Sequence, residues 1–293
     1  MIINQTNLQG LYTSFKVLFN NAFADATTYH DKIAMPVNTG GKENTYPWLG
    51  NFPGMKEWVG ERQIESLVAH EYTIKNKKFE STVEVDRDDI EDDSYGVYTP
   101  IIQEMGRSAK AHPDELIFHE LLLSGWDTPC YDKKAFFATD HPVGDKTVSN
   151  SGGGTGTAAW FLMDLSRAIK PVIFQIRKKP QFVARTRVND DNVFYQNKYI
   201  YGVDDRKNVG FGLWQLAFGS KQTFNDVNYA AARAAMQGFT NEAGKPLGIR
   251  PTHLVHGPSL EGDVRKILKA ELIGSTSNIW KDTAEPLMVP WLP

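Results

Sequence analysis

Cys130 and His141 are the two residues of this sequence best suited to covalent catalysis. A histidine beside a cysteine can remove the thiol proton and so create a nucleophile. Both residues fall in one predicted loop, however, and neither a strand-to-helix turn nor an oxyanion site flanks them. We therefore interpret Cys130 as a structural thiol, and we keep a soluble enzyme that uses Cys130 and His141 as one alternative function.

Two further pairs of histidines offer nitrogen atoms of the kind that bind metals. His112 and His119 lie seven residues apart on a predicted helix, but Pro113 interrupts the helical register between them. His253 and His256 bracket a predicted strand and lack a carboxylate at ligand spacing. A catalytic zinc site generally takes three protein ligands. The sequence therefore predicts no metal site.

An acidic run and a glycine run complete the candidate sites. Residues 86–93, DRDDIEDD, place Ile90 where a calcium loop requires an oxygen ligand, and no glycine follows at the required spacing. We interpret the run as a solvated acidic turn or as an intersubunit salt-bridge patch. Residues 152–154 are three glycines that do not join a strand to a helix with Lys-Ser or Lys-Thr, as a phosphate-binding loop would. We predict no catalytic residue and no cofactor.

The charge of the chain is nearly balanced, with a formal net charge of -3. This excludes a strong overall attraction to nucleic acid or to an acidic membrane. A local positive cluster consists of Arg177, Lys178, Lys179, Arg185 and Arg187. It can contact a phosphate backbone without reading sequence, or it is simply a solvated surface of strands and a turn.

Targeting and redox signals are sparse in this sequence. The first ten residues lack the basic and apolar regions of a signal peptide, and no apolar stretch reaches the ~18 residues that suggest a membrane span. The single cysteine excludes an internal disulfide and fits a reducing compartment. We therefore expect a soluble protein with no membrane partner.

Two helices dominate the first half of the predicted structure. Residues 8–26 carry apolar side chains along one side, as an amphipathic helix does. Residues 99–124 are predicted to form a longer helix. Pro100 suits its first turn, and Gly125 suits its end. Pro113 lies within it, so we expect a kink or two stacked helices there.

Residues 45–85 are rich in aromatic residues and are broken by proline and glycine. Two strand-like segments, 71–75 and 79–85, alternate in polarity and predict half-buried strands or a projecting two-stranded ribbon. Such a ribbon is marginally stable alone, and no partner surface is evident in the same chain. We expect it to bury aromatic residues against a neighbouring copy, namely Trp48, Phe52 or Trp58.

The second half alternates strand-like and helical patterns, which predicts the α+β class. The segment 158–169 reads as a short helix or as a strand followed by a helix. Strands are predicted at 172–176, 182–188, 193–200, 211–218 and 252–256, and at the end of the chain. Turns are predicted at 178–180, 189–191 and 204–205, and helices at 224–238 and 258–270.

Six long, colinear stretches carry a resemblance to a known family. They read KIAMPVN, NTYPWLGNFPGMKEWVGER, FESTVEVDRDDIEDDSYGVYTPIIQEMGRSAKAHPDELIF, PCYDKKAFFATDHPV, DLSRAIKPVIFQIRKKPQFVARTRVNDDNVF and GKPLGIRPTHLV. The sequence resembles the major head subunit (major capsid protein) family of Mu-like phages and prophages from about Leu8 to its end.

This resemblance implies the Hong Kong 97-type phage capsid fold. The implied parts are an N-terminal arm (1–35), an extended β-hairpin loop (36–85), a peripheral domain (86–221) with a spine helix at 99–124, and an axial domain (222–293). The order of the parts after residue 150 departs from many capsid proteins of this fold. We therefore expect a permuted order in which Ala158 and Trp291 end close together.

The resemblance also implies a function. It is that of a structural major capsid protein that self-assembles into hexamers and pentamers of an icosahedral head enclosing double-stranded DNA. The implied partners are other copies, a scaffold, a portal and a head protease, with weak non-specific contact to the DNA. The implied location is the virion, and the host cytoplasm during assembly. A cellular encapsulin-like shell enclosing a cargo enzyme is the other alternative.

Overall fold

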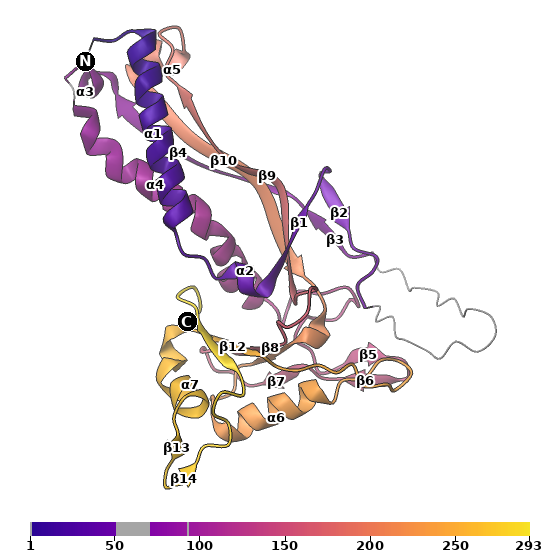
Figure 1. The fold of residues 1–293 in the computed structure, drawn as a ribbon. Helices are drawn as coiled ribbons and strands as arrows, with labels where there is room; N and C mark the ends of the chain where they lie inside the picture. The colour runs from indigo at the N-terminus through magenta and orange to yellow at the C-terminus, as the bar shows by residue number, and fades with distance from the viewer. Residues whose placement is uncertain (1, 51–70, 93) are drawn as a thin grey trace.

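We describe a computed structural model of the 293-residue chain, which covers residues 2–50, 71–92 and 94–293. The molecule has an elongated helix-and-sheet part and a more compact part that holds the C-terminus (Figure 1). Within the described ranges, no helix is long and apolar enough to cross a membrane. The predicted α+β class is confirmed.

The elongated part is a four-stranded sheet with two helices on one face (Figure 1). Its strand order is β1 (Ala34–Asn38), β9 (Val172–Arg185), β10 (Lys198–Phe211) and β4 (Lys77–Asp86). Strand β1 runs parallel to β9, and the other pairs are antiparallel. The covering helices are α1 (Gln5–Asp25) and α4 (Thr99–Asp114).

Aromatic side chains fill the space between these helices and the sheet. The rings of Phe19 and Phe182 stack with centroids 5.2 Å apart, and Phe15 meets Tyr201 edge-on at 5.0 Å. The amphipathic helix predicted at 8–26 is confirmed as α1, and Asn4 caps it by accepting a hydrogen bond from the Asn7 amide at 2.8 Å.

The helix around Pro113 changes type rather than breaking in two. Helix α4 passes into a π-helix, η2 (Glu115–Leu122), one residue after Asp114. Pro113 itself lies in the last turn of α4, two residues before the π-helix begins. The two stacked helices offered as one alternative do not occur, and the change of helix type was not predicted.

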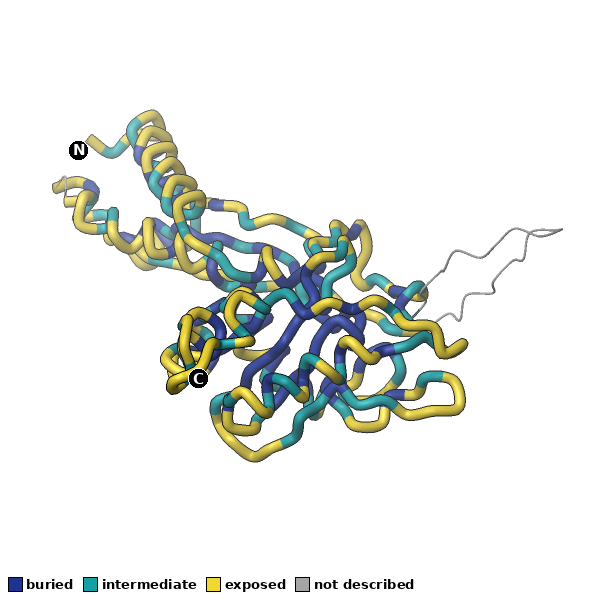
Figure 2. The backbone as a smooth tube through the Cα atoms, turned by 60° about the horizontal axis from the view of Figure 1, so that its bottom comes forward, coloured by how far each residue is buried: buried dark blue, intermediate teal, exposed yellow. Residues whose placement is uncertain are grey.

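The compact part is built on a five-stranded sheet. Its order is β15 (Glu285–Met288), β12 (His253–His256), β8 (Trp160–Met163), β11 (Ala217–Ser220) and β7 (Ser151–Gly153). Every residue of β8 is buried, and buried strands run through the middle of this part in Figure 2. Helices α6 (Asp226–Gln237) and α7 (Glu261–Leu268) belong to it.

This sheet combines strands that are far apart in the sequence. Trp160 of β8 and Met288 of β15 both lie opposite His256 of β12. The strands nearest to Ala158 and Trp291, β8 and β15, therefore belong to one sheet and flank β12. The predicted boundary between residues 221 and 222 cuts this sheet, because β7, β8 and β11 precede it.

The remaining elements are short. They are α2 (His30–Ile33), β2 (Glu43–Thr45), β3 (Thr73–Lys75), α3 (Arg87–Glu91), η1 (Ser94–Tyr98), β5 (His141–Val143), β6 (Lys146–Val148), α5 (Asp191–Gln196), η3 (Trp214–Leu216), η4 (Pro258–Leu260), β13 (Leu272–Ile273) and β14 (Thr276–Ser277).

Several predicted strands and turns were wrong. The turns at 178–180 and 204–205 lie inside β9 and β10, where shifts in strand register absorb the irregular residues. The strand at 193–200 begins as helix α5, which ends at Asn197 in a left-handed conformation. No helix forms within 158–169, because this stretch supplies the central strand β8.

The segments 71–75 and 79–85 form strands as predicted, but the two-stranded ribbon offered as one alternative does not form. Strand β3 pairs with β2, whereas β4 pairs with β10 over Lys198–Lys207 in the same chain. Trp48 is half-buried and packs on the core of its own chain, with its ring 6.2 Å from that of Tyr46. Phe52 and Trp58 lie outside the described residues.

Gly106 lies where α4 packs closely against α1, and a substitution there tests this packing. A Cβ atom at Gly106 would lie 2.4 Å from the carbonyl oxygen of Phe19. We expect Gly106→Ala to lower the free energy of unfolding by about 1–3 kcal/mol, because the helices must separate. The control Gly10→Ala, on α1 with open space around it, should raise that free energy by about 0.5–1 kcal/mol. Denaturant unfolding of the two purified variants measures both, and equal effects would contradict the predicted close packing.

Candidate functional site

Cys130, Asp132 and His141 meet in the loop that precedes and enters β5. The thiol of Cys130 donates to Asp132 Oδ1 at 3.1 Å, and His141 Nδ1 lies 2.6 Å from Asp132 Oδ2. The side chain of His141 is fully buried, and that of Asp132 is 5% exposed. The structure brings the predicted pair together, but through a carboxylate that sequence analysis did not single out.

The imidazole of His141 has hydrogen-bonding neighbours at both ring nitrogens and an aromatic ring stacked on it. Its Nε2 lies 3.1 Å from Asn150 Oδ1 and 3.3 Å from the Phe136 carbonyl oxygen. Its ring stacks on Trp214 with centroids 4.1 Å apart. Oxygen atoms thus face both ring nitrogens, so neither nitrogen is directed at the Cys130 sulfur. The histidine fastens the loop to the core and is not placed as a base for the thiol.

The electrostatics of the cluster oppose thiolate chemistry. Burial, and then the neighbouring Asp132 carboxylate, raise the pKa of the Cys130 thiol far above its ordinary value. Burial alone would raise the pKa of Asp132, but hydrogen bonds from His141 and Cys130 outweigh it and lower that pKa. The thiol therefore stays protonated, and a protonated thiol is a poor nucleophile.

The same three residues are potential metal ligands. Their ligand atoms lie within 4.8 Å of one another, which singles them out among the residues that the structure describes. The Cys130 thiol and the His141 Nδ1 atom already share the carboxylate of Asp132 by hydrogen bonding, and three buried ligands fall short of a closed structural zinc site. We assign the cluster a structural role.

The other predicted histidine pairs do not converge. His112 packs edge-on against Phe79 at 4.4 Å, and burial together with Lys207 lowers its pKa to about 4. His119 is exposed in the π-helix. On β12, His253 Nδ1 lies 2.9 Å from Thr252 Oγ1, whereas the buried His256 faces the carbonyl oxygen of Gly257.

The acidic run forms a short helix, α3, rather than a solvated turn. Asp88 accepts a hydrogen bond from Asn197 at 2.9 Å, and Arg87 pairs with Glu91 at 2.9 Å. Asp89 accepts from the hydroxyl of Tyr98. Asp93 lies outside the described residues. Part of this charge is therefore neutralised within the chain.

The glycine run lies at the edge of the five-stranded sheet. Gly154 has a φ of +91°, and a Cβ atom there would lie 2.5 Å from the backbone nitrogen of Gln222. Close backbone approach explains the glycine without a bound phosphate.

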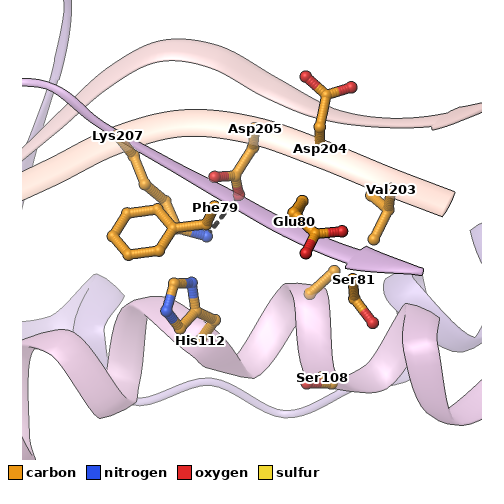
Figure 3. A pocket seen from close by; sticks show the side chains of 10 residues that line it. Phe79, Glu80, Ser81, Ser108, His112, Val203, Asp204, Asp205 and Lys207 are labelled. Atoms are coloured by element: carbon orange, nitrogen blue, oxygen red, sulfur yellow. Dashed lines mark hydrogen bonds and ion pairs between the residues drawn. The ribbon is translucent and has the colours of Figure 1, made fainter.

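A cavity of about 160 Å³ opens between β4, β10 and α4 (Figure 3). Lys207 and Asp205 form an ion pair of 2.6 Å in its wall, with side chains only 4% and 7% exposed. Burial raises the pKa of Asp205 and lowers that of Lys207. Sequence analysis placed Asp205 in a predicted turn. In the structure the odd-numbered residues of β10 from Tyr199 to Lys207 are buried, and this alternation was not recognised in the sequence.

The positive cluster follows strand β9. Its exposed members are Arg177, Lys179, Arg185 and Arg187. Lys178 differs, because it is half-buried and pairs with Asp204 of β10. The predicted turn at its centre is absent, so these side chains lie along one continuous strand and the residues just after it.

Comparison with known proteins identifies a family over nearly the whole chain. The family described as Mu-like prophage major head subunit gpT matches residues 8–292. The major capsid protein of Escherichia phage Mu is 44% identical over 283 residues, which cover 93% of this chain and 92% of that protein. The Mu-like prophage FluMu major head subunit of Haemophilus influenzae is 43% identical and covers 90% of this chain and 89% of that protein.

Solved structures agree with these sequence matches. The procapsid subunit of bacteriophage JBD30 matches with a TM-score of 0.88 at 42% identity, covering 99% of this chain and 100% of that chain. The subunit of the bacteriophage JBD30 capsid matches with a TM-score of 0.81 at 32% identity and covers 100% of both chains. The expected capsid fold is confirmed.

Cys130 should react slowly in the folded chain. At pH 8 we expect iodoacetamide to modify it at least about a hundredfold more slowly than in the denatured chain, because burial keeps the thiol protonated. Mass spectrometry of timed samples measures the rate, and the denatured chain is the control. A rate in the folded chain near that of a free thiol would contradict the assignment.

Asp132 should stabilise the fold in a pH-dependent way. A lowered carboxyl pKa contributes stability above the ordinary carboxyl range, and this is lost as pH falls through the lowered pKa. Asp132→Asn should therefore cost about 1–3 kcal/mol of unfolding free energy at pH 7, and less below about pH 4. The control Asp140→Asn removes an exposed pair with Lys134 and should cost under about 1 kcal/mol. A constant difference from pH 7 to pH 3 would contradict the assigned ionisation.

Proposed function

The chain belongs to the family of Mu-like prophage major head subunits, so its role is that of a structural major capsid protein of the virion, and we propose that it assembles into hexamers and pentamers of an icosahedral head around double-stranded DNA. The observation that carries the proposal is the match over residues 8–292 together with the JBD30 procapsid likeness. The relatives are structural subunits, so an enzyme that uses Cys130 and His141 has no support, and neither has a cargo-enclosing cellular shell.

The four proposed parts of the subunit follow the expected plan with two changes of boundary. The arm remains 1–35. The extended loop ends before β4, because β4 completes the sheet of the peripheral domain. Strands β7, β8 and β11 belong with the axial domain, because they share one sheet with β12 and β15. The elongated sheet with α4 is then the peripheral domain, and helix α1 of the arm packs against it.

The proposed partners follow from this role. Other copies supply the main contacts, and a scaffold, a portal and a head protease act during assembly in the host cytoplasm. Contact with packaged DNA is weak, because the net charge of -3 gives the chain no overall attraction to a polyanion. A shell of this kind holds DNA by enclosure rather than by affinity.

Assembly of the purified chain tests the proposal. We expect closed shells or rings of subunits in negative-stain electron micrographs, because capsid subunits complete their interfaces against other copies. Cys130→Ala is the matched control and should assemble to the same extent, since the thiol has no role in the interface or in catalysis. A compact single particle under every assembly condition would overturn the proposed function.

A further inference from the structure

The cavity between β4, β10 and α4 has the properties of a built site. We call it the edge socket and define it by Phe79, Glu80, Ser81, Ser108, His112 and Asp205. It lies at the β4 edge of the four-stranded sheet, where no further strand follows in the described part of the chain. Figure 3 shows Asp205, Lys207 and Phe79 on its strand side and His112 and Ser108 on its helix side.

Asp205 carries an unused acceptor in this socket. Its Oδ2 atom takes the ion pair with Lys207, whereas Oδ1 is buried and has no hydrogen-bond partner. Only 7% of the Asp205 side chain is exposed. A buried carboxylate oxygen without a partner is costly, and native structures rarely leave one unpaired. The socket therefore lacks a hydrogen-bond donor.

The charge in the socket indicates which donor it takes. Lys207 balances Asp205, Lys178 balances Asp204, and Glu80 at the rim adds one exposed negative charge. His112, with its pKa lowered to about 4, is neutral at physiological pH and adds no positive charge. A cationic donor, an ammonium or guanidinium group, satisfies both the free oxygen and the excess negative charge.

The opposite edge of the same sheet offers such groups. Strand β1 pairs only with residues 172–176 of β9, so the rest of β9 has no strand on its outer side. The exposed basic side chains there are Arg177, Lys179, Arg185 and Arg187, and no ion pair within the described ranges uses them. Strand β4 begins with two lysines but continues with Glu80, Glu84 and Asp86. The free edge of β9 therefore carries basic residues near both of its ends, whereas β4 beyond Lys78 carries only acidic charges, of which Glu84 already pairs with Lys198.

We propose that the edge socket receives one of these β9 lysine or arginine side chains from a second copy of the chain. Copies placed side by side bring the free edge of β9 in one against the β4 edge of the next, which is a heterologous contact able to close into a ring. A cavity of about 160 Å³ has room for the end of one such side chain. The inference rests on the proposed self-assembly and names one of its contacts.

A cryo-electron microscopy map of shells assembled from the full chain tests this directly. The expected result is density for a neighbour's β9 side chain that ends within hydrogen-bond distance of Asp205 Oδ1. Shells in which the socket holds only water or an ion would overturn the inference and leave the proposed function standing. A chain that forms no shells would overturn both.

A substitution that fills the edge socket gives a second test and leaves the ion pair of Lys207 and Asp205 unchanged in sequence. Ser108→Phe fills the mouth from the exposed face of α4, and Gln103→Phe on another exposed face of the same helix is its control. We expect Ser108→Phe to raise the critical concentration for assembly at least about tenfold and Gln103→Phe to leave it unchanged. Equal effects would contradict the proposal.

Double variants then identify the occupant. One substitution among Arg177→Gln, Lys179→Gln, Arg185→Gln and Arg187→Gln should raise the critical concentration as Ser108→Phe does. Combined with Ser108→Phe, that substitution should add little, because both remove one contact. Additive effects for all four substitutions would overturn the assignment of the occupant to β9.

Discussion

The buried carboxylate of Asp114 joins the elements on which the elongated part depends. It accepts hydrogen bonds from the backbone nitrogens of Tyr29 and His30, and it lies 2.6 Å from Nδ1 of the His30 ring. Asp114 ends α4, whereas Tyr29 and His30 start the short helix that leads into β1. One side chain thereby fixes the end of the N-terminal region to the spine helix, at the level where α4 becomes a π-helix. A buried carboxylate needs such donors, since an unpaired charge would be costly.

The main elements and the family could be predicted from the sequence. The elements that were missed or misplaced have physical causes. Helix α1 was found because its apolar spacing is regular, and Pro113 was recognised inside the long helix. The π-helix itself, which has no distinctive spacing, was missed. Strands β9 and β10 were divided because Pro180 and the pair Asp204-Asp205 are typical of turns, and pairing between long strands overrode that local preference.

Sites were harder to predict than elements. Cys130 and His141 were recognised as neighbours, but Asp132, which connects them, was missed although it lies only two residues after the cysteine. The edge socket joins residues about 30 and 90 positions apart in sequence, and no local pattern reports such a meeting. The pairing of β4 with β10 could not be predicted either, because the register between distant strands is decided by packing.

The central position of β8 has a consequence for the order of events on the ribosome. Strand β8 is flanked by β12 and β11, and β12 pairs in turn with β15 at residues 285–288. During translation from the N-terminus, β8 emerges long before two of the strands that complete its sheet. Its fully buried apolar side chains must wait for nearly the whole chain, and such long-range pairing is slow and exposed to aggregation. Nascent chains that end before β15 consequently lack a strand of this five-stranded sheet.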